Sequence, residues 1–208
     1  MLTTKKLIDL ANVGDADAQF RLGYRLAFGR KRPTPVRWKE IITLWKRSAQ
    51  SGNIRASFYL GVAYDHGLGV RRNYREAERL YRFAALKGHP VAQYNLALLF
   101  RDGVGVKQSD RTATYWLQES AEGGFADAQR DFGVALFYGK GVRANARKAV
   151  RFYRMAARKG DASANFNLGL CYRHGTGVRR STRFANLYFQ KAASLGHTAA
   201  KRVLSCAS

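Results

Sequence analysis

Apolar side chains recur along the chain in blocks of one design, and each block opens with one helical pattern. The pattern is an alanine, an apolar residue four positions later, a small residue directly after it and another apolar residue three positions further on. The five copies are Ala18/Leu22/Gly23/Leu26, Ala56/Leu60/Gly61/Tyr64, Ala92/Leu96/Ala97/Phe100, Ala128/Phe132/Gly133/Leu136 and Ala164/Leu168/Gly169/Tyr172. Because this spacing places the apolar residues on one face, it predicts five helices that each bury that face. Glycine inside a helix costs about 1 kcal/mol relative to alanine, so its return in four copies indicates close approach of a neighbouring backbone.

A second apolar pattern follows in each block and predicts a partner helix. Its four clearest copies are Ala77/Leu80/Tyr81/Ala84/Ala85, Ala113/Trp116/Leu117/Ser120/Ala121, Ala149/Phe152/Tyr153/Ala156/Ala157 and Ala185/Tyr188/Phe189/Ala192/Ala193. The residues that precede these copies are types that cap helix N-termini. They are Asn73, Ser109, Asn145 and Ser181. We interpret the recurring aromatic residues as core filling between helix layers.

A Gly-x-Gly-Val loop separates the two helices and gives the period of the array. Its copies begin at Gly67, Gly103, Gly139 and Gly175. The interval is 36 residues each time, and a fixed period of this length is typical of a solenoid. The first glycine suits the left-handed conformation that ends helices, and Gly29 is expected to end the corresponding helix of the first block. There the loop is replaced by residues 30–35, which contain two prolines and predict a remodelled basic turn.

The blocks predict a single solenoid domain over residues 1–208. Five complete repeats span residues 14–196, of which the first has 38 residues and the others 36. Residues 1–13 match the second half of a repeat, and residues 197–208 match the first half. Half repeats at both ends are typical of solenoids, whose terminal units cap an otherwise open core. The predicted fold class is therefore all-α, an α-solenoid of five helix-pair repeats with a half-repeat cap at each end.

The repeated motif resembles a known family. Ala-x-x-x-Leu-Gly-x-x-Tyr, Gly-x-Gly-Val and Ala-Ala-x-x-Gly on this period are similar to the Sel-one-like repeat, a relative of the tetratricopeptide repeat. The resemblance covers residues 14–206 and implies a right-handed superhelix of antiparallel helix pairs that acts as a non-catalytic adaptor or scaffold. This chain lacks the repeated cysteine pairs of some members, and the Asp that usually begins the second helix is Asn or Ser.

The charge of the chain is strongly positive and predicts a polyanionic partner. Lys and Arg number 37 against 14 Asp and Glu, which gives a net charge of +23. Such an excess suits nucleic acid, an anionic membrane surface or an acidic protein. The excess lies toward both ends, since residues 89–124 carry 3 basic and 4 acidic residues.

Two patterns of cations are the candidate partner contacts. One is a ridge, because Arg or Lys directly follows each Gly-x-Gly-Val loop and equal repeat positions stack roughly 10 Å apart. The other is a stripe along the solvent face of the second helix, where Arg favours geometric contact with phosphate or carboxylate. With the basic turn, the candidates are Arg30, Lys31, Arg32, Arg71, Arg72, Arg75, Lys107, Arg111, Arg143, Arg147, Arg151, Arg154, Arg158, Arg179, Arg180 and Arg183. A solvated helix face is the plainer interpretation of the same residues.

The sequence holds no pattern that predicts catalysis, a cofactor or a metal site. His66 and His174 share one repeat position three periods apart, as do His89 and His197, so neither pair is close enough to hold an ion. His66 and His174 each precede a helix-ending glycine, where an imidazole is expected to bond the last carbonyls. The glycine loops lack the strand and the Gly-Lys-Ser/Thr of a phosphate-binding loop. We therefore expect no enzyme and no small-molecule substrate.

The two cysteines, Cys171 and Cys206, lie in matching helices of adjacent repeats. With no further cysteines in the chain, we interpret them as buried or free thiols in preference to a bridge or a nucleophile.

The leading functional hypothesis is a scaffold within a ribonucleoprotein or another RNA-containing complex, with basic surfaces that contact the nucleic-acid backbone. The alternative is an adaptor that binds an acidic protein in a secretion, signalling or toxin-neutralising role. Peripheral membrane attachment ranks last, since no exposed apolar anchor is evident. No apolar run is long enough for a transmembrane segment, and the N-terminus makes a poor signal peptide. We expect an intracellular protein, in the cytoplasm or an organelle matrix, that works with other proteins of a larger complex.

Overall fold

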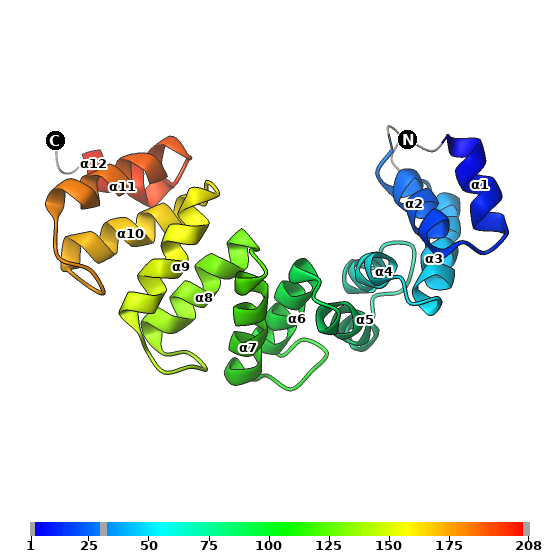
Figure 1. The fold of residues 1–208 in the computed structure, drawn as a ribbon, viewed down its shortest axis with the longest axis horizontal. Helices are drawn as coiled ribbons and strands as arrows, with labels where there is room; N and C mark the ends of the chain where they lie inside the picture. Colours follow the sequence, from blue (N-terminus) through cyan, green and yellow to red (C-terminus); the bar gives the residue numbers. More distant parts are fainter. Residues whose placement is uncertain (1–2, 30–32, 206–208) are drawn as a thin grey trace. The chain divides into compact units, whose positions relative to one another are not determined.

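The computed structural model describes residues 3–29 and 33–205, which form twelve α-helices and no strand (Figure 1). The helices are α1 (Thr4–Asn12), α2 (Ala16–Ala27), α3 (Pro35–Gln50), α4 (Ile54–His66), α5 (Tyr74–Leu86), α6 (Pro90–Asp102), α7 (Asp110–Glu122), α8 (Ala126–Tyr138), α9 (Ala146–Arg158), α10 (Ala162–His174), α11 (Thr182–Ser194) and α12 (Thr198–Ser205). This confirms the predicted all-α class. It also confirms one short helix at each end of the array.

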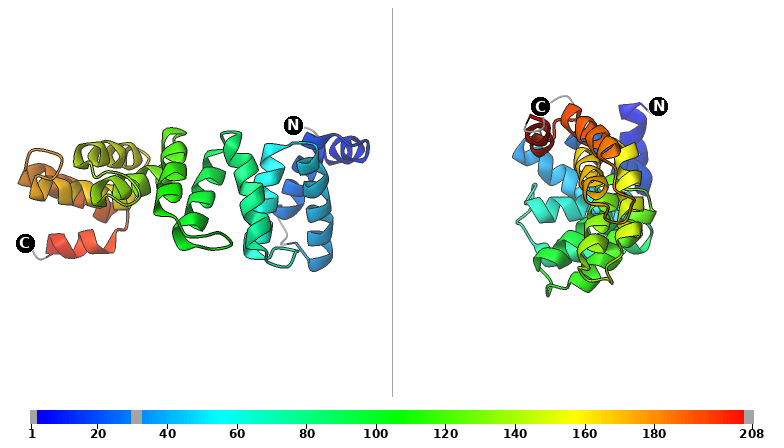
Figure 2. Two further views of the ribbon diagram at one scale, coloured as in Figure 1. Left: turned by 90° about the horizontal axis from the view of Figure 1, so that it is seen from below. Right: turned by 90° about the vertical axis from the view of Figure 1, so that its left-hand side faces the viewer.

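The helices form two compact units. The N-terminal unit is Met1–Gln108 and holds α1 to α6, and the C-terminal unit is Ser109–Ser208 and holds α7 to α12. Within each unit every helix packs against the next one along the chain, and the tightest pairs are the first and second helices of one repeat. Figure 2 shows these helix pairs from two further sides. The organisation of residues 1–208 as one solenoid domain stays a prediction.

The predicted helix caps are present. The four residues before the second helices accept hydrogen bonds from backbone N–H groups, as in Asn145 from Lys148 at 2.9 Å and Asn73 from Glu76 at 3.1 Å. Gly67, Gly103, Gly139 and Gly175 are left-handed C-caps. The first repeat differs from the prediction, because α2 ends at Ala27 and Phe28 is its C-cap. Gly29 has no positive φ. No Gly-Val turn follows it, so the chain has no need of a left-handed residue there.

The glycines inside the first helices are explained by a ring and not by a backbone. In each of these repeats an aromatic side chain of the second helix lies on the glycine. A Cβ at Gly133 would lie 2.6 Å from Cε1 of Tyr153, and a Cβ at Gly61 would lie 2.8 Å from Cδ1 of Tyr81. The pairs are Gly23–Trp45, Gly61–Tyr81, Gly133–Tyr153 and Gly169–Phe189. These four rings are all buried, which confirms that they are core residues.

A second recurring contact joins successive repeats. Phe58 stacks on His89 with ring centroids 4.5 Å apart, and Phe166 stacks on His197 at 4.4 Å. Each histidine also caps the next first helix, because its Nδ1 accepts a backbone N–H, at 3.2 Å for His89 and 3.3 Å for His197. Arg130 takes the place of the phenylalanine in α8. Its Nη1 donates to the capping Asp161 at 2.9 Å. An ion pair thus stands at this joint where the Phe58–His89 and Phe166–His197 joints have a ring stack.

We predict that Gly133→Ala destabilises the C-terminal unit. Alanine adds about 1 kcal/mol of helix propensity, but a methyl group forced against a buried ring costs about 3 kcal/mol at the upper end of overpacking. The expected net loss in the free energy of unfolding is about 2 kcal/mol, measured by urea denaturation. The loss should shrink in a Tyr153→Leu background, which removes the ring. An equal loss in both backgrounds would contradict the assignment.

We predict that the His89 joint weakens in acid. Burial, with a smaller effect from Arg55, lowers the pKa of His89 below its usual value. The folded state therefore prefers neutral imidazole, so the contribution to stability is complete above about pH 6.5 and is lost as the pH falls further. A protonated Nδ1 also cannot accept the N–H of Ala92.

The matched control is His89→Asn, which keeps a capping side chain without the titration, as Asn53 does for α4. The melting temperature of the parent chain should fall more than that of the variant between about pH 7.5 and 5. Parallel curves for the two proteins would show that His89 is not the responsible group.

Candidate partner-binding grooves

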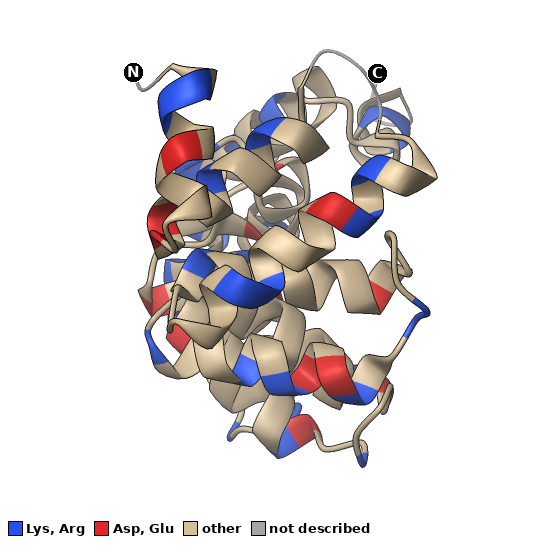
Figure 3. Ribbon diagram, turned by 90° about the vertical axis from the view of Figure 1, so that its right-hand side faces the viewer, with Lys and Arg blue, Asp and Glu red and all other residues tan. Residues whose placement is uncertain are grey.

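The predicted cations that the structure describes are all exposed. Basic segments occur both on helices and on the loops between them (Figure 3). The thirteen described candidates are Arg71, Arg72, Arg75, Lys107, Arg111, Arg143, Arg147, Arg151, Arg154, Arg158, Arg179, Arg180 and Arg183. Within residues 3–29 and 33–205 none of these thirteen forms an ion pair. Arg30, Lys31 and Arg32 lie outside the described residues. The exposed cations are thus available to a partner, and their role as contacts stays a prediction.

The second glycine of each loop holds the ridge of cations against the preceding repeat. A Cβ at Gly105 would lie 2.6 Å from Cβ of Tyr74, in the first turn of α5. A Cβ at Gly177 would lie closer still to the carbonyl oxygen of Ala146, in the first turn of α9. Each loop therefore crosses the start of the previous second helix. This contact fixes where the Arg or Lys after the loop emerges.

In the N-terminal unit this crossing forms an N-terminal groove of about 680 Å³. Its lining residues are Tyr64, Val70, Arg71, Arg72, Asn73, Tyr74, Arg75 and Gly105. Nη1 of Arg72 donates to the hydroxyl of Tyr74 at 3.2 Å, and the guanidinium lies 5.8 Å from the centre of that ring. Arg72 is therefore held in place, while Arg71 and Arg75 are exposed beside it.

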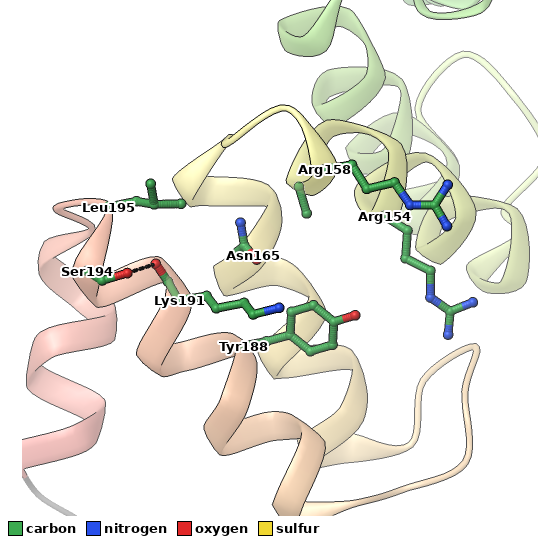
Figure 4. A pocket seen from close by; sticks show the side chains of 8 residues that line it. Arg154, Arg158, Asn165, Tyr188, Lys191, Ser194 and Leu195 are labelled. Carbon is green, nitrogen blue, oxygen red and sulfur yellow. Dashed lines mark hydrogen bonds between the residues drawn. The ribbon is translucent and has the colours of Figure 1, made fainter.

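A C-terminal groove of about 470 Å³ lies between α9, α10 and α11 (Figure 4). Arg154 and Arg158 extend from α9, and Lys191 and Tyr188 extend from α11. The other lining residues are Ala157, Asn165, Ser194 and Leu195. No carboxylate is among the lining residues. The groove therefore presents three cations with no internal counter-charge.

Aromatic rings position two of these cations. Nη2 of Arg154 donates to the hydroxyl of Tyr172 at 2.8 Å. The amine of Lys191 lies 5.7 Å from the centre of the Tyr188 ring. The two tyrosine rings stack on each other with centroids 5.5 Å apart and planes 11° from parallel. Arginine and tyrosine are enriched among the residues that dominate binding energy at protein interfaces.

The same groove position in other repeats carries acidic residues. In the N-terminal unit, Lys46 and Gln50 occupy the places of Arg154 and Arg158. Glu76 and Arg79 also line that groove, one turn apart on α5, and pair at 2.7 Å. In the groove between α7 and α9, Glu122 lies among the lining residues with Lys148 and Arg151. The predicted stripe on α9 is therefore divided, since Arg151 faces a mixed groove and Arg154 and Arg158 face a cationic one.

Sequence reasoning missed Tyr172, Tyr188 and Lys191 as surface residues of this groove. The two tyrosines belong to the core patterns, yet both are half-buried. Lys191 lies in a helix with no basic stripe, two turns away from Arg183. The sequence did contain one indication of this contact. Lys191 comes three residues after Tyr188, and residues at this spacing are neighbours on a helix.

The described residues contain no group of three or more His, Cys, Asp or Glu placed to hold a metal ion. No helix among them is long and apolar enough to cross a membrane. The expected bonds from His66 and His174 to the last helix carbonyls do not form in the described structure. The loop takes those carbonyls instead: Leu68 N–H donates to Ala63 O at 2.9 Å, and Thr176 N–H to Cys171 O at 3.0 Å.

Helix-pair repeats with exposed grooves define the class of this protein, a repeat scaffold. A Sel1 repeat family model matches residues 16–35, 54–89, 90–125, 126–161 and 162–197. The chain therefore belongs to the Sel1 repeat family, and the predicted resemblance and solenoid fold class are confirmed. Sel1 repeat proteins are generally non-catalytic scaffolds for protein–protein interaction. The first match covers little more than α2, in agreement with the remodelled first repeat.

Solved structures with the same fold include longer proteins. A protective antigen present in uropathogenic Escherichia coli is 32% identical with a TM-score of 0.89, and the match covers 96% of this chain and 42% of that one. A Sel1 repeat protein from Oxalobacter formigenes is 29% identical with a TM-score of 0.86, over 99% and 59% of the two chains. The chain thus spans less than two thirds of either relative.

A more distant match is an immunity protein from Pseudomonas aeruginosa, 26% identical with a TM-score of 0.53, over 89% of this chain and 66% of that one. No curated protein sequence matches the chain.

We predict that Cys171 is unreactive in the folded protein. Its side chain is buried, and burial raises the pKa of the thiol to about 11. The nucleophilic thiolate is therefore scarce at neutral pH. In a Cys206→Ser variant, Ellman's reagent should leave the native protein unmodified for hours and should titrate one thiol after denaturation. Rapid native modification would contradict the buried assignment.

Proposed function

We propose that this Sel1 repeat scaffold binds an acidic protein partner through the C-terminal groove. One observation carries the proposal: Arg154, Arg158 and Lys191 face one groove without a carboxylate, beside stacked tyrosines. A carboxylate-rich segment would supply the missing counter-charge. Arg154 is already held by Tyr172, so less side-chain entropy is lost on binding.

The family supports a protein partner over RNA. Sel1 repeat scaffolds mediate protein–protein contacts, and a distant structural relative is an immunity protein. RNA is the second candidate, supported by the net charge of +23 and by the unpaired cations of both units. The two candidates differ in geometry: an RNA backbone needs many spaced phosphate contacts, whereas an acidic segment needs one local groove.

The test compares two labelled probes, poly-glutamate of about 20 residues and a mixed RNA of about 20 nucleotides, by fluorescence anisotropy. The groove variant is Arg158→Glu with Lys191→Glu. We expect it to weaken poly-glutamate binding about tenfold at physiological salt, which corresponds to about 1.4 kcal/mol. Both side chains are exposed and the described structure shows no side-chain hydrogen bond from either, so folding should be unaffected.

The matched control is Arg47→Glu with Lys87→Glu, which changes net charge equally at exposed positions outside the groove. It should weaken poly-glutamate binding less than twofold. Equal losses in both variants would reduce the attraction to net charge and would reject the groove. Tight RNA binding that falls steeply between about 50 and 200 mM salt, with weak poly-glutamate binding, would favour the RNA scaffold.

A further inference from the structure

Three aromatic rings form a cluster on α2 and α4, and none of them lines the N-terminal or the C-terminal groove. Tyr24 and Phe28 belong to α2 and its C-cap, and Tyr59 belongs to α4. The ring centroids are 4.7 Å apart for Tyr24 and Phe28, 5.2 Å for Tyr24 and Tyr59, and 5.7 Å for Phe28 and Tyr59. Phe28 is 59% exposed and Tyr24 is 38% exposed. We call these three residues the aromatic cup.

The aromatic cup is particular to the first two repeats, since Tyr24 and Phe28 belong to the first repeat and Tyr59 belongs to the second. The residues at the position of Phe28 in later repeats are His66, Asp102, Tyr138 and His174. Those at the position of Tyr24 are aliphatic, and those at the position of Tyr59 are Asn or Asp. Repeat packing therefore needs no aromatic residue at any of the three positions. Stability of the solenoid does not explain why all three are aromatic here.

The cup is rigid at its base and open at its rim. Tyr59 packs on the buried rings of Phe20 and Trp45, with centroids 5.7 and 5.6 Å away. Burial and a hydrogen bond with Tyr24 raise the pKa of Tyr59, so its hydroxyl stays neutral. The ring planes within the cup meet at 48°, 77° and 60°. The rings pack on one another, and Phe28 and Tyr24 leave apolar ring surface exposed against which a side chain can pack. They offer no parallel faces between which a base could stack.

Positive charge lies beside the cup. The guanidinium of the exposed Arg55 lies 4.6 Å from the centre of the Phe20 ring, which contacts Tyr24 and Tyr59, and exposed Arg25 follows Tyr24 in α2. The nearby carboxylate of Asp17 is already paired with Arg21 at 2.6 Å. An occupant with acidic residues beside its apolar group therefore complements this surface.

We propose that the aromatic cup is a docking site for one apolar side chain within an acidic segment of a partner protein. The occupant is a peptide segment with an aromatic or large aliphatic residue flanked by carboxylates. The site lies in the N-terminal unit and uses none of the C-terminal groove residues. A failure of the proposed C-terminal groove would therefore leave this proposal untouched, and the reverse also holds.

The test uses two labelled peptides with about four glutamates on each side of a central residue, which is phenylalanine in one peptide and serine in the other. The ratio of their dissociation constants cancels general charge attraction. We expect the phenylalanine peptide to bind the parent chain about tenfold more tightly. Phe28→Ser should reduce this ratio to near one. Its side chain is mostly exposed, so the melting temperature should change little.

Tyr138→Ser is the matched control, since Tyr138 has the same repeat position and is 72% exposed. It should leave the ratio unchanged, as should Arg158→Glu with Lys191→Glu, which separates this site from the C-terminal groove. A ratio near one in the parent chain would overturn the proposal. Sedimentation that shows Phe28-dependent dimers would assign the cup to a second copy instead. Phe28-dependent competition by single-stranded oligouridylate would assign it to RNA.

Discussion

The packing of an aromatic ring of the second helix against a glycine of the first helix is the contact on which the repeat depends. In four repeats the second helix presents a buried aromatic side chain, and the first helix has no Cβ at the point where that ring lies. The glycine lowers helix propensity, yet it lets the helices approach closely enough to bury a whole ring, and burial is the larger effect. The third repeat has Ala97 and Leu117 at these two positions. A methyl group on one helix thus accompanies a smaller side chain on the other.

Because this contact lies inside each repeat, the surfaces between and outside the repeats are free to vary. The groove beside the second helices shows the result. One scaffold position carries Gln50 in the first repeat, Glu122 in the third and Arg158 in the fourth. The local charge of the groove changes from mixed to fully cationic while the backbone that holds it stays the same. A solenoid can in this way separate the residues that fold it from the residues that bind.

Much of the fold could be predicted from the sequence, because the repeats average out local ambiguity. Caps such as Asn145, the left-handed glycines and the buried faces recur four or five times, and each recurrence supports the others. The reason for the glycines inside the first helices could not be predicted. Periodicity shows that a neighbour lies close to each glycine, but it does not show whether that neighbour is an aromatic ring or a backbone. The grooves were predicted in part. Exposed arginines follow from helix periodicity, but Lys191 and Tyr172 come together from different helices, and only coordinates bring such residues side by side. The aromatic cup was hidden because Tyr24 and Phe28 read as ordinary apolar residues.

The joints between repeats have a consequence for anyone who would recombine this protein. At these joints one half of the contact belongs to a repeat and the other half to its successor, as with Phe58 and His89 or Arg130 and Asp161. One repeat therefore cannot be exchanged for another without changing the contacts at its two joints. If the fourth repeat were transplanted to precede one that begins with histidine, the guanidinium of Arg130 would meet an imidazole in place of a carboxylate. A segment chosen for recombination should therefore begin and end in the middle of a repeat. Both residues of each joint, such as Phe58 with His89 or Arg130 with Asp161, then stay in the same segment.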